Sequence, residues 1–379
     1  MRIALVAPLA EAVPPKLYGG TERVVSCLAE ELVRQGHHVT LFASGGSETA
    51  AELMVGASQS LRLAGIRDHL GSTLAMLRGV RRRADDFDII HFHIDLLPQA
   101  LFHDLAYKCL VTLHGRLDVP DSWPVYATYP EMPLVSISDA QRHPMPKNAN
   151  WLATIHHGLA PRVCPFNAKG GDYLVFLGRI APEKRPDRAI EIATRAELPL
   201  KIAAKVDSAD QEYYKTKIKP LLDHPLIEFV GEINEAQKCA FLGNARALLF
   251  PIDWPEPFGL VMIEAMSAGT PVIAWGNGSV PEVLAQGISG RIVNSIESAA
   301  QAARQAAQMD RRKVRAEFER RFTAEKMAAA YVAVYRSHLA RASKSVRLKD
   351  LPILPGTAAP GLSSPWEELE RDVEPASSG

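Results

Sequence analysis

The chain has 379 residues, more than one ordinary hydrophobic core holds, which predicts two domains. Basic and acidic residues both number 43, so the formal net charge is zero, and the four cysteines form no CxxC pair. The charge balance argues against nucleic acid as a partner, and the cysteine spacing argues against a zinc ribbon or a redox pair. We expect reduced thiols and a cytoplasmic protein.

Short apolar runs alternate with helical stretches along the first half of the chain. The run RIALVA precedes a predicted helix near Thr21–Gln35, which Gly36 closes. The run HVTLFA follows, then a predicted long helical region to about Arg83, and then the runs DIIHFH and CLVTLH. Such alternation is typical of a parallel sheet that helices cover on both faces.

The same alternation restarts with YLVFLG, after a stretch near 161–171 that is rich in Pro, Asn and Gly. Helices are predicted near Ala209–Leu222 and from Asn234, where Asn234 and Gln237 are spaced for a capping box. We therefore predict an α/β protein with two doubly wound domains, over 1–160 and 172–320. The chain continues with a final helix at 323–342. Residues 343–379 are rich in Pro, Ser and Gly, and we expect them to form a disordered tail.

Ligands of open α/β sheets bind beyond the carboxyl ends of the strands, so the loops there carry most weight. Neither half has GxGxxG after a strand, which argues against a nicotinamide or flavin dehydrogenase. The stretch YGGTERVV places Gly19 and Gly20 at the start of a helix, where backbone N–H groups favour an anion. The stretch FLGRIAPEKRPD places Arg179 and Lys184 after a strand, and this pair of cations suits a diphosphate.

The stretch PEPFGLVMIEAMSAGTPVIA holds two glutamates, Glu256 and Glu264, around the start of another predicted helix. The amides of Phe258, Gly259 and Leu260 would form an anion site at that start. Carboxylates accept hydrogen bonds from vicinal hydroxyls, so both glutamates suit a sugar or a ribose near a phosphate. The spacing alone also allows a pair of glycosidase carboxylates.

Histidines follow two of the predicted strands. His114 stands just past a strand end, with Gly115 leaving room beside it. His91 and His93 alternate on one strand, so both rings should face the same side. Metal binding needs a third ligand, which the spacing does not supply, and we expect neither a metal nor a cofactor.

Taken together, these motifs resemble the retaining glycosyltransferases of family 4, the glycosyl transferases group 1. The most specific part is the E-x7-E element from Glu256 to Glu264, with the GR…EK loop and GGTE at the expected places. The resemblance extends to about residue 340. It implies the GT-B fold, in which two Rossmann-like domains face a cleft, and a final helix that crosses back to the first domain.

The resemblance also implies roles for these residues toward a nucleotide diphosphate sugar. Glu264 should bind the ribose hydroxyls, and Glu256 the donor sugar with the Phe258–Leu260 backbone. Arg179 and Lys184 should hold the diphosphate and stabilise the leaving group. From the other domain, Gly19 and Gly20 should meet the diphosphate and His114 the donor sugar. The second strand of the nucleotide-binding domain departs from the family pattern, because Lys205 stands in IAAKVDSAD, where many relatives have a Gly-rich turn.

The resulting hypothesis is transfer of a sugar, with retention, from a donor such as UDP-glucose or GDP-mannose to an unknown hydroxyl acceptor. The alternatives are a glycoside hydrolase, a nucleotide-sugar epimerase of similar fold, and a non-catalytic nucleotide-sugar-binding protein. The basic stretches RRR at 81–83 and DRRKVRAEFERRF at 310–322 raise the question of a membrane surface. We expect at most a weak peripheral contact there, since charged helix faces are usually solvated.

Overall fold

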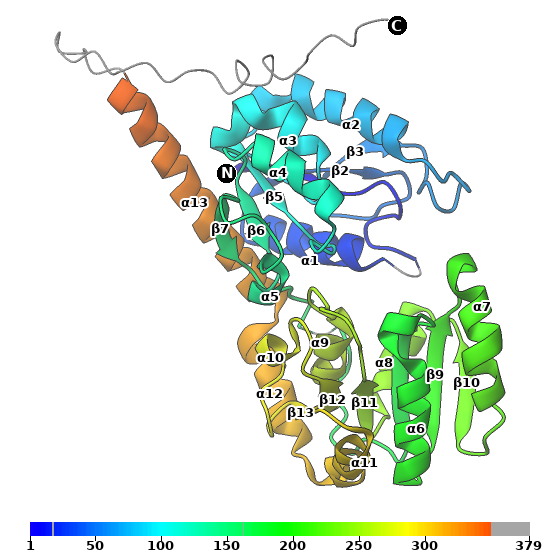
Figure 1. Ribbon diagram of the computed structural model, residues 1–379. Helices are drawn as coiled ribbons and strands as arrows, with labels where there is room; N and C mark the ends of the chain where they lie inside the picture. The colour runs from blue at the N-terminus through cyan, green and yellow to red at the C-terminus, as the bar shows by residue number, and fades with distance from the viewer. Residues whose placement is uncertain (17–18, 162, 350–379) are drawn as a thin grey trace, which may run out of the picture. The chain divides into compact units, whose positions relative to one another are not determined.

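Two parallel β-sheets, one from each half of the chain, organise the fold (Figure 1). The computed structural model describes residues 1–16, 19–161 and 163–349, with side chains only as far as 343. Within these residues, the seven-stranded first sheet has the order β3-β2-β1-β4-β5-β6-β7, and the six-stranded second has β10-β9-β8-β11-β12-β13. All neighbouring strands are parallel. The predicted α/β fold with two doubly wound sheets is confirmed.

The strands of the first sheet are β1 (Arg2–Val6), β2 (His38–Ser44), β3 (Glu52–Ala57), β4 (Ile89–Phe92), β5 (Cys109–Thr112), β6 (Leu134–Ser136) and β7 (Trp151–Thr154). Those of the second sheet are β8 (Leu174–Arg179), β9 (Leu200–Lys205), β10 (Ile227–Gly231), β11 (Ala247–Phe250), β12 (Val272–Trp275) and β13 (Gly290–Val293). In each sheet the chain order reverses beside the first strand, between β1 and β4 and between β8 and β11. Such reversals create the crevice in which ligands bind.

The helices lie between these strands and after the last of them. In the first half they are α1 (Gly20–Arg34), α2 (Leu70–Arg82), α3 (Leu97–Phe102), α4 (Trp123–Thr128) and α5 (Asp139–Arg142). In the second half they are α6 (Pro186–Ala196), α7 (Gln211–Tyr213), α8 (Glu235–Gly243), α9 (Leu260–Ser267), α10 (Val280–Val283), α11 (Ile296–Gln305), α12 (Arg311–Arg321) and α13 (Ala324–Lys349). No helix among the described residues has the length and apolarity needed to cross a bilayer.

Local sequence signals set several helix ends as predicted. Helix α1 ends at Arg34, and Gly36 then takes a left-handed φ of 81°, which glycine adopts at little cost. Asn234 caps α8 in a full capping box with Gln237. These signals set the C-terminal end of α1 and the N-terminal end of α8.

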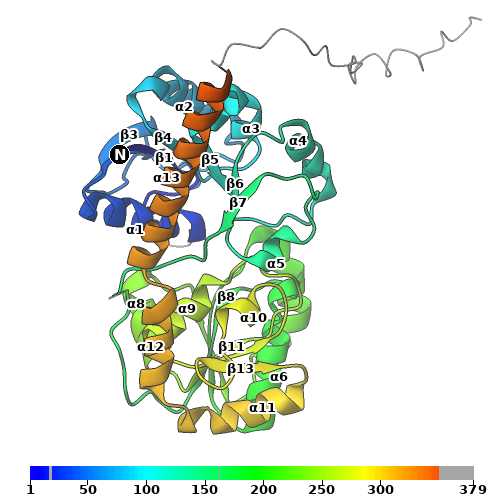
Figure 2. The same cartoon turned by 90° about the vertical axis from the view of Figure 1, so that its left-hand side faces the viewer.

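The final helix packs against the first sheet, although it follows the second in sequence (Figures 1 and 2). Tyr331 and Tyr335 of α13 are fully buried in the same core as Leu5 of β1 and Leu28 of α1. Residues Met1–Leu339 accordingly form one compact unit. The helix runs to Lys349, so the tail expected from residue 343 begins with helical residues, because its lysines, arginine and leucine are good helix formers. Residues 350–379 lie outside the described part of the chain.

Two regions differ from the predicted elements. The expected long helical region before Arg83 contains a strand, β3, because Glu52–Ala57 pairs along the outer edge of β2. This edge strand is only half-buried, and its short stretch 53–57 has one β-branched residue and a glycine, so its strand propensity is weak. The expected helix near 209–222 is a series of short turns, with α7 followed by a π-helical segment at Tyr214–Ile218.

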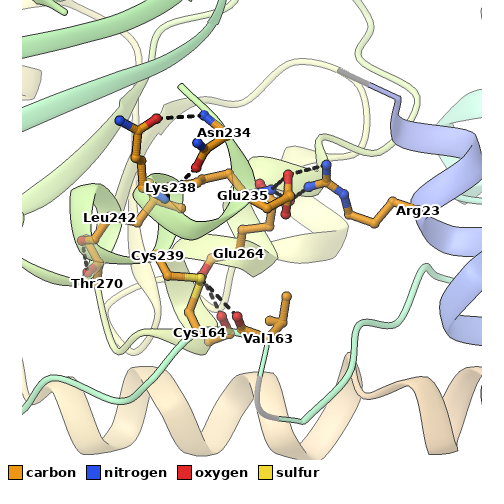
Figure 3. Close-up of a disulfide and its surroundings, with 12 residues drawn as sticks. Arg23, Val163, Cys164, Asn234, Glu235, Lys238, Cys239, Leu242, Glu264 and Thr270 are labelled. Carbon is orange, nitrogen blue, oxygen red and sulfur yellow. Dashed lines mark hydrogen bonds and ion pairs between the residues drawn. A yellow bond between two sulfur atoms is a disulfide. The ribbon is translucent and has the colours of Figure 1, made fainter. Parts of the chain in front are cut away.

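The expectation of four reduced thiols is wrong for two cysteines. Cys164 and Cys239 form a disulfide across 75 residues of sequence, with their Cα atoms 5.0 Å apart (Figure 3). Cys164 lies in the segment between the two sheets and Cys239 in α8, so the fold brings together residues that sequence spacing cannot pair. Cys27 and Cys109 are free thiols. The bond fastens α8 to the inter-sheet segment.

Candidate active site

A cavity of about 650 Å³ opens between the carboxyl ends of the two sheets. All ten residues to which the resemblance assigns a role line it. From the first half these are Gly19, Gly20 and His114, and from the second half Arg179, Lys184, Glu256, Phe258, Gly259, Leu260 and Glu264. The structure therefore brings the predicted residues into one site, and their individual roles stay predictions.

Topology explains this convergence, because the lining loops follow the strands at which the chain order reverses. The loop after β1 ends at Gly19 and Gly20, at the start of α1. The loop after β8 carries Lys184, and the loop after β11 carries Glu256. The two halves come close here, since a Cβ on Gly20 would lie 3.4 Å from the Leu260 side chain.

The side of the cavity formed by the second sheet is highly charged. We call Arg179, Lys184, Lys238, Glu256 and Glu264 the charged wall. Arg179, at the end of β8, pairs with Glu183 at 2.7 Å and Asp210 at 3.1 Å. Lys184 forms an ion pair with Glu256 and lies 4.7 Å from the centre of the Trp254 ring.

Glu256 is held by two neighbours in the loop after β11. Besides its pair with Lys184, its Oε2 accepts a hydrogen bond from Trp254 Nε1 at 2.9 Å. Gly278 crosses directly beside it, where a Cβ would lie 2.4 Å from the Glu256 backbone N and O. A larger residue at Gly278 would displace the Glu256 loop. Close backbone packing therefore helps to fix the position of the Glu256 carboxylate.

Glu264 lies at the centre of a buried ion cluster that joins both halves of the chain (Figure 3). Its Oε1 accepts from Lys238 Nζ of α8 at 2.5 Å and from Arg23 of α1 at 2.8 Å. Glu235 contacts the same two cations. Burial favours the neutral acid, but Lys238 and Arg23 outweigh it and hold the pKa of Glu264 below its ordinary value. Glu264 is therefore an ionised acceptor at neutral pH.

Helix α9 begins at the cavity, next to the two glutamates. Gly259 is its N-cap residue with a φ of 79°, and a Cβ there would also approach Met262 and Phe250 within 3.0 Å. The backbone of the preceding corner is fixed by Ser279, whose hydroxyl donates to the Phe258 carbonyl at 2.8 Å. The N-terminus of α9 thus presents backbone amides to the cavity at a defined place.

The side formed by the first sheet is uncharged where its histidines gather. We call His93, His114 and His157 the histidine wall; His114 and His157 line the cavity, and His93 lies behind them. His114 Nε2 lies 2.9 Å from His93 Nδ1, and its ring stacks on His157 with centroids 5.2 Å apart. Burial lowers the pKa of His114 to about 3, so the ring is neutral at physiological pH.

The rings of His91 and His93 face the same side, as predicted, with their centroids 4.1 Å apart. His91 is fully engaged by Tyr335 and Thr112, each at 2.7 Å. Within the described residues, no three His, Cys, Asp or Glu side chains are placed to hold a metal ion. The histidine pair is therefore part of the packing behind His114.

Sequence reasoning missed several lining residues. Arg23 follows Gly20 by three residues, and Lys238 follows the predicted cap Asn234 by four, so both occupy first or second helical turns that point to the cavity. The helix starts were predicted, but which side chains they aim inward was not. Lys205, which the sequence marks as unusual, also lines the cavity and pairs with Asp207 at 2.9 Å.

Comparisons with known proteins identify the family of the chain. Residues 18–164 match the family described as Glycosyltransferase Family 4, and residues 165–324 match Glycosyl transferases group 1. The chain is similar to a phosphatidyl-myo-inositol mannosyltransferase of Mycobacterium leprae. The two are 26% identical over 344 residues, which cover 79% of this chain and 85% of that protein.

Solved structures share the fold at low sequence identity. A sucrose-phosphate synthase from Thermosynechococcus elongatus has a TM-score of 0.73 and 19% identity, over 90% of this chain and 99% of that one. The Anabaena protein HepE, in complex with UDP and glucose, has a TM-score of 0.67 and 17% identity, over 89% of this chain and 100% of that one. These likenesses establish the GT-B arrangement of the two sheets.

The two family matches meet at residues 164 and 165, in the segment that joins the sheets. They cover both walls of the cavity, and relatives across most of the chain are named glycosyltransferases. The chain belongs to glycosyltransferase family 4, the glycosyl transferases group 1, and is a glycosyltransferase with the GT-B fold.

Proposed function

We propose that this protein transfers a hexose from a nucleotide diphosphate sugar to a hydroxyl acceptor, with retention at the anomeric carbon. One observation carries the proposal. Arg179 and Lys184 share a single cavity with the N-terminus of α9, and two carboxylates, Glu256 and Glu264, lie beside that N-terminus. A nucleotide diphosphate sugar matches this arrangement, because its diphosphate suits the cations and the α9 N-terminus, and its pentose and hexose hydroxyls suit the two carboxylates.

The assigned contacts follow from the charges of the cavity. Arg179 and Lys184 bind the diphosphate together with the α9 amides, and the start of α1 at Gly19 and Gly20 approaches it from the other sheet. Glu264, kept ionised by its two cations, accepts hydrogen bonds from the ribose hydroxyls. Glu256 does the same for the hexose, which lies toward His114.

In the proposed step, the acceptor hydroxyl oxygen bonds to the anomeric carbon on the face that the diphosphate leaves. The bond between that carbon and the diphosphate oxygen breaks, and the departing phosphate takes the acceptor proton. Negative charge therefore grows on the phosphate, where Arg179, Lys184 and the α9 amides stabilise it. These side chains supply the role that a divalent metal ion has in other transferases.

The donor base and sugar have two candidates. The Mycobacterium leprae relative is named a mannosyltransferase, and the Anabaena structure holds UDP and glucose. GDP-mannose and UDP-glucose are therefore the first donors to test. The acceptor would be a hydroxyl compound of glycan, glycolipid or glycoside synthesis, entering from the side of the first sheet.

A transfer reaction followed by proton NMR tests the function. The protein is incubated with each donor and a mixture of hydroxyl acceptors, and the anomeric coupling of the new glycoside is compared with that of the donor. The proposal predicts a product with the donor's anomeric configuration. An inverted product contradicts the retaining mechanism.

The same reaction separates the alternative functions. Formation of an epimer of the nucleotide sugar in the absence of an acceptor indicates an epimerase. Cleavage of a glycoside that carries no nucleotide indicates a hydrolase. Tight donor binding with neither transfer nor slow donor hydrolysis indicates a binding protein. The ion pairs of both glutamates argue against the hydrolase, which needs one carboxyl group free to act as the acid: Glu256 pairs with Lys184, and Glu264 pairs with Lys238 and Arg23.

Weak peripheral membrane contact stays a prediction. In the stretch 310–322, Arg311 and Arg315 donate to backbone carbonyls, and Arg320 and Arg321 pair with Glu317. These arginines stabilise the fold, so less of the stretch is available to a lipid surface. Sedimentation with anionic liposomes checks the point, and absence of binding removes the prediction.

A further inference from the structure

One aromatic side chain, Trp254, contacts both members of the Lys184–Glu256 ion pair. Trp254 lies in the loop after β11, lines the cavity and is half-buried. Its Nε1–H donates to Glu256 Oε2 at 2.9 Å, and Lys184 Nζ lies 4.7 Å from the centre of its ring. Since Lys184 and Glu256 also pair with each other, the three side chains form a closed set of contacts.

The contacts of the Glu256 carboxylate fall on one of its two oxygens. Oε2 accepts from both Trp254 and Lys184, whereas Oε1 accepts no hydrogen bond from any described residue. Oε1 is also not one of the buried atoms that lack a partner, so it keeps exposed surface. Glu256 lines the cavity. A carboxylate that is anchored through Oε2 therefore leaves Oε1 to accept from a hydroxyl of a ligand.

The two donors to Oε2 should respond differently to a bound diphosphate. The Lys184 ammonium is a point charge on a flexible stem, and the proposed diphosphate competes with Glu256 for it. The indole carries a single N–H on a rigid ring, and Glu256 is its acceptor. The contact from Trp254 therefore persists when Lys184 turns toward the phosphates.

We infer that Trp254 is a positioning residue: its Nε1–H holds Glu256 through Oε2, so that Oε1 faces the donor hexose while Lys184 binds the diphosphate. The inference rests on the proposed function, which supplies the hexose and the diphosphate. Trp254 acts through Glu256 and not through its own contact with the substrate. Its ring also keeps the Lys184 ammonium beside the cavity, because an indole face attracts a cation without neutralising it.

The Trp254 ring is itself oriented from both halves of the chain. Arg116, in the loop after β5, has its guanidinium carbon 5.5 Å from the centre of the ring. Asp118 in turn holds Arg116 through two hydrogen bonds of 2.8 Å. Cations from both halves therefore contact the same indole, which restricts its rotation and the direction of its N–H.

Backbone contacts fix the Trp254 loop independently of the indole. The Asp253 N–H donates to the Glu183 carbonyl at 2.8 Å, and the Ser279 N–H donates to the Glu256 carbonyl at 3.0 Å. A change of the Trp254 side chain should therefore leave the path of the loop unchanged. The effect of the indole on Glu256 can thus be separated from the folding of the loop.

NMR of protein labelled with nitrogen-15 tryptophan tests the hydrogen bond without any ligand. The full chain is used, and the signal that disappears in Trp254→Phe is that of Trp254 Nε1–H. In Glu256→Ala, which removes the acceptor, we expect this signal to shift and its proton to exchange faster with water. An unchanged shift and exchange rate would overturn the inference, whether or not the protein proves to be a transferase.

Calorimetric titration with UDP-glucose, GDP-mannose, UDP and GDP tests the consequence for the ligand. Trp254→Phe keeps an aromatic face for Lys184 but removes the N–H. We expect the Kd of the nucleotide sugar that binds to rise roughly ten-fold, and the Kd of its nucleoside diphosphate to stay within about two-fold. The reason is that Glu256 Oε1 contacts only the hexose in the proposed complex.

The outcomes separate the inference from the proposed function. If a nucleotide sugar binds and its Kd is the same in the wild type and Trp254→Phe, the inference fails and the proposed function stands. If none of the four compounds binds to the wild type, the proposed function fails and the inference fails with it.

A double-mutant cycle distinguishes positioning from packing. Because Trp254 acts through Glu256, Trp254→Phe should change the nucleotide-sugar Kd by no more than about two-fold in the Glu256→Ala background. Equal effects of Trp254→Phe in the two backgrounds would overturn the positioning role. If Trp254→Phe does not fold, Trp254→Leu, which also lacks the N–H, decides the question in the same cycle.

Trp151→Phe is the matched control. Trp151 is a half-buried tryptophan of β7 whose ring also lies beside an arginine, with the Arg142 guanidinium carbon 5.0 Å from its centre. It stands outside the cavity lining. The same substitution there should leave the Kd values of the nucleotide sugar and of the nucleoside diphosphate unchanged. A rise of the nucleotide-sugar Kd in Trp151→Phe equal to that in Trp254→Phe would contradict a specific role for Trp254.

Discussion

The two walls of the cavity both face the proposed polar ligand, but one wall is charged and the other is uncharged. The charged wall fixes its carboxylates with cations, so that Glu264 is ionised although it is buried. The histidine wall has neutral rings and leaves nitrogens without partners among the described residues. Charged side chains suit the proposed diphosphate and ribose. Neutral hydrogen-bond donors suit a hexose, because its anomeric carbon develops positive charge during the proposed transfer. The difference teaches that each wall is matched to one end of the proposed donor.

The largest effect is expected from the cations of the charged wall. Arg179→Ala and Lys184→Ala should each lower kcat roughly 100- to 1,000-fold, because each removes a cation that we propose stabilises charge on the departing phosphate. Steady-state kinetics with the preferred donor measures the effect. Lys201→Ala, which removes an exposed pair with Glu228 on β9 and β10, is the control. Turnover within a few-fold of wild type in either cavity variant would remove these residues from the mechanism.

The disulfide sharpens the comparison, because the charged wall alone has a covalent tie, through α8, within the described residues. Replacing Cys164 and Cys239 by serine should lower the free energy of unfolding by about 3 kcal/mol. Urea unfolding of the oxidised wild type and of the double variant measures it. Cys27→Ala, at a free thiol, is the control. No free-energy difference, together with four titratable thiols in the wild type, would contradict the disulfide.

A substitution of Glu264 tests how much the charged wall contributes to the affinity for the nucleotide sugar. Glu264→Gln removes the ionised group that we propose accepts hydrogen bonds from the ribose, so the Kd of the nucleotide sugar should rise roughly 10- to 100-fold. Calorimetric titration measures the Kd, and Glu297→Gln on the exposed end of α11 is the matched control. A Kd unchanged by Glu264→Gln would place the ribose elsewhere.

The smallest expected effect is the pH dependence of the Glu264 cluster. Lys238 and Arg23 lower the pKa of Glu264 from 4.5, so its ion pairs stabilise the folded state above pH 4.5. This stabilisation is lost as the pH falls through the folded pKa, at about 1.4 kcal/mol for each unit of pKa difference. The gap in unfolding free energy between wild type and Glu264→Gln should therefore shrink below pH 4.5. A gap that widens on acidification would contradict this account.

The two walls also differ in how much of each could be predicted from the sequence. Local patterns predicted four residues of the charged wall, because Glu256 and Glu264 stand around one strand-to-helix turn and Arg179 and Lys184 lie at and just after the end of one strand, whereas Lys238 was missed. Both sheets follow in the same way from their continuous apolar central strands. The edge strand β3 was missed because its stretch 53–57 has only one β-branched residue and includes a glycine, which makes its strand propensity weak.

The histidine wall depends on contacts between separate strands. His93 follows β4, His114 follows β5 and His157 follows β7, so only the sheet order brings the rings together. Of these three histidines, only His114 was predicted to be a site residue for this reason. The Cys164–Cys239 bond and the Lys238–Glu264 pair were beyond sequence reasoning on the same ground, since each joins elements that meet only in the folded chain.

A calorimetric titration of the wild-type protein with UDP-, GDP- and ADP-sugars, with the matching nucleoside diphosphates and with the free hexoses, tests the central claim most directly. If the charged wall holds the nucleotide and the histidine wall the sugar, one nucleotide sugar binds best. Its nucleoside diphosphate should then retain most of the binding free energy, and the free hexose should bind undetectably. Binding of a free hexose as tightly as any nucleotide sugar, or binding of no nucleotide at all, would contradict the account.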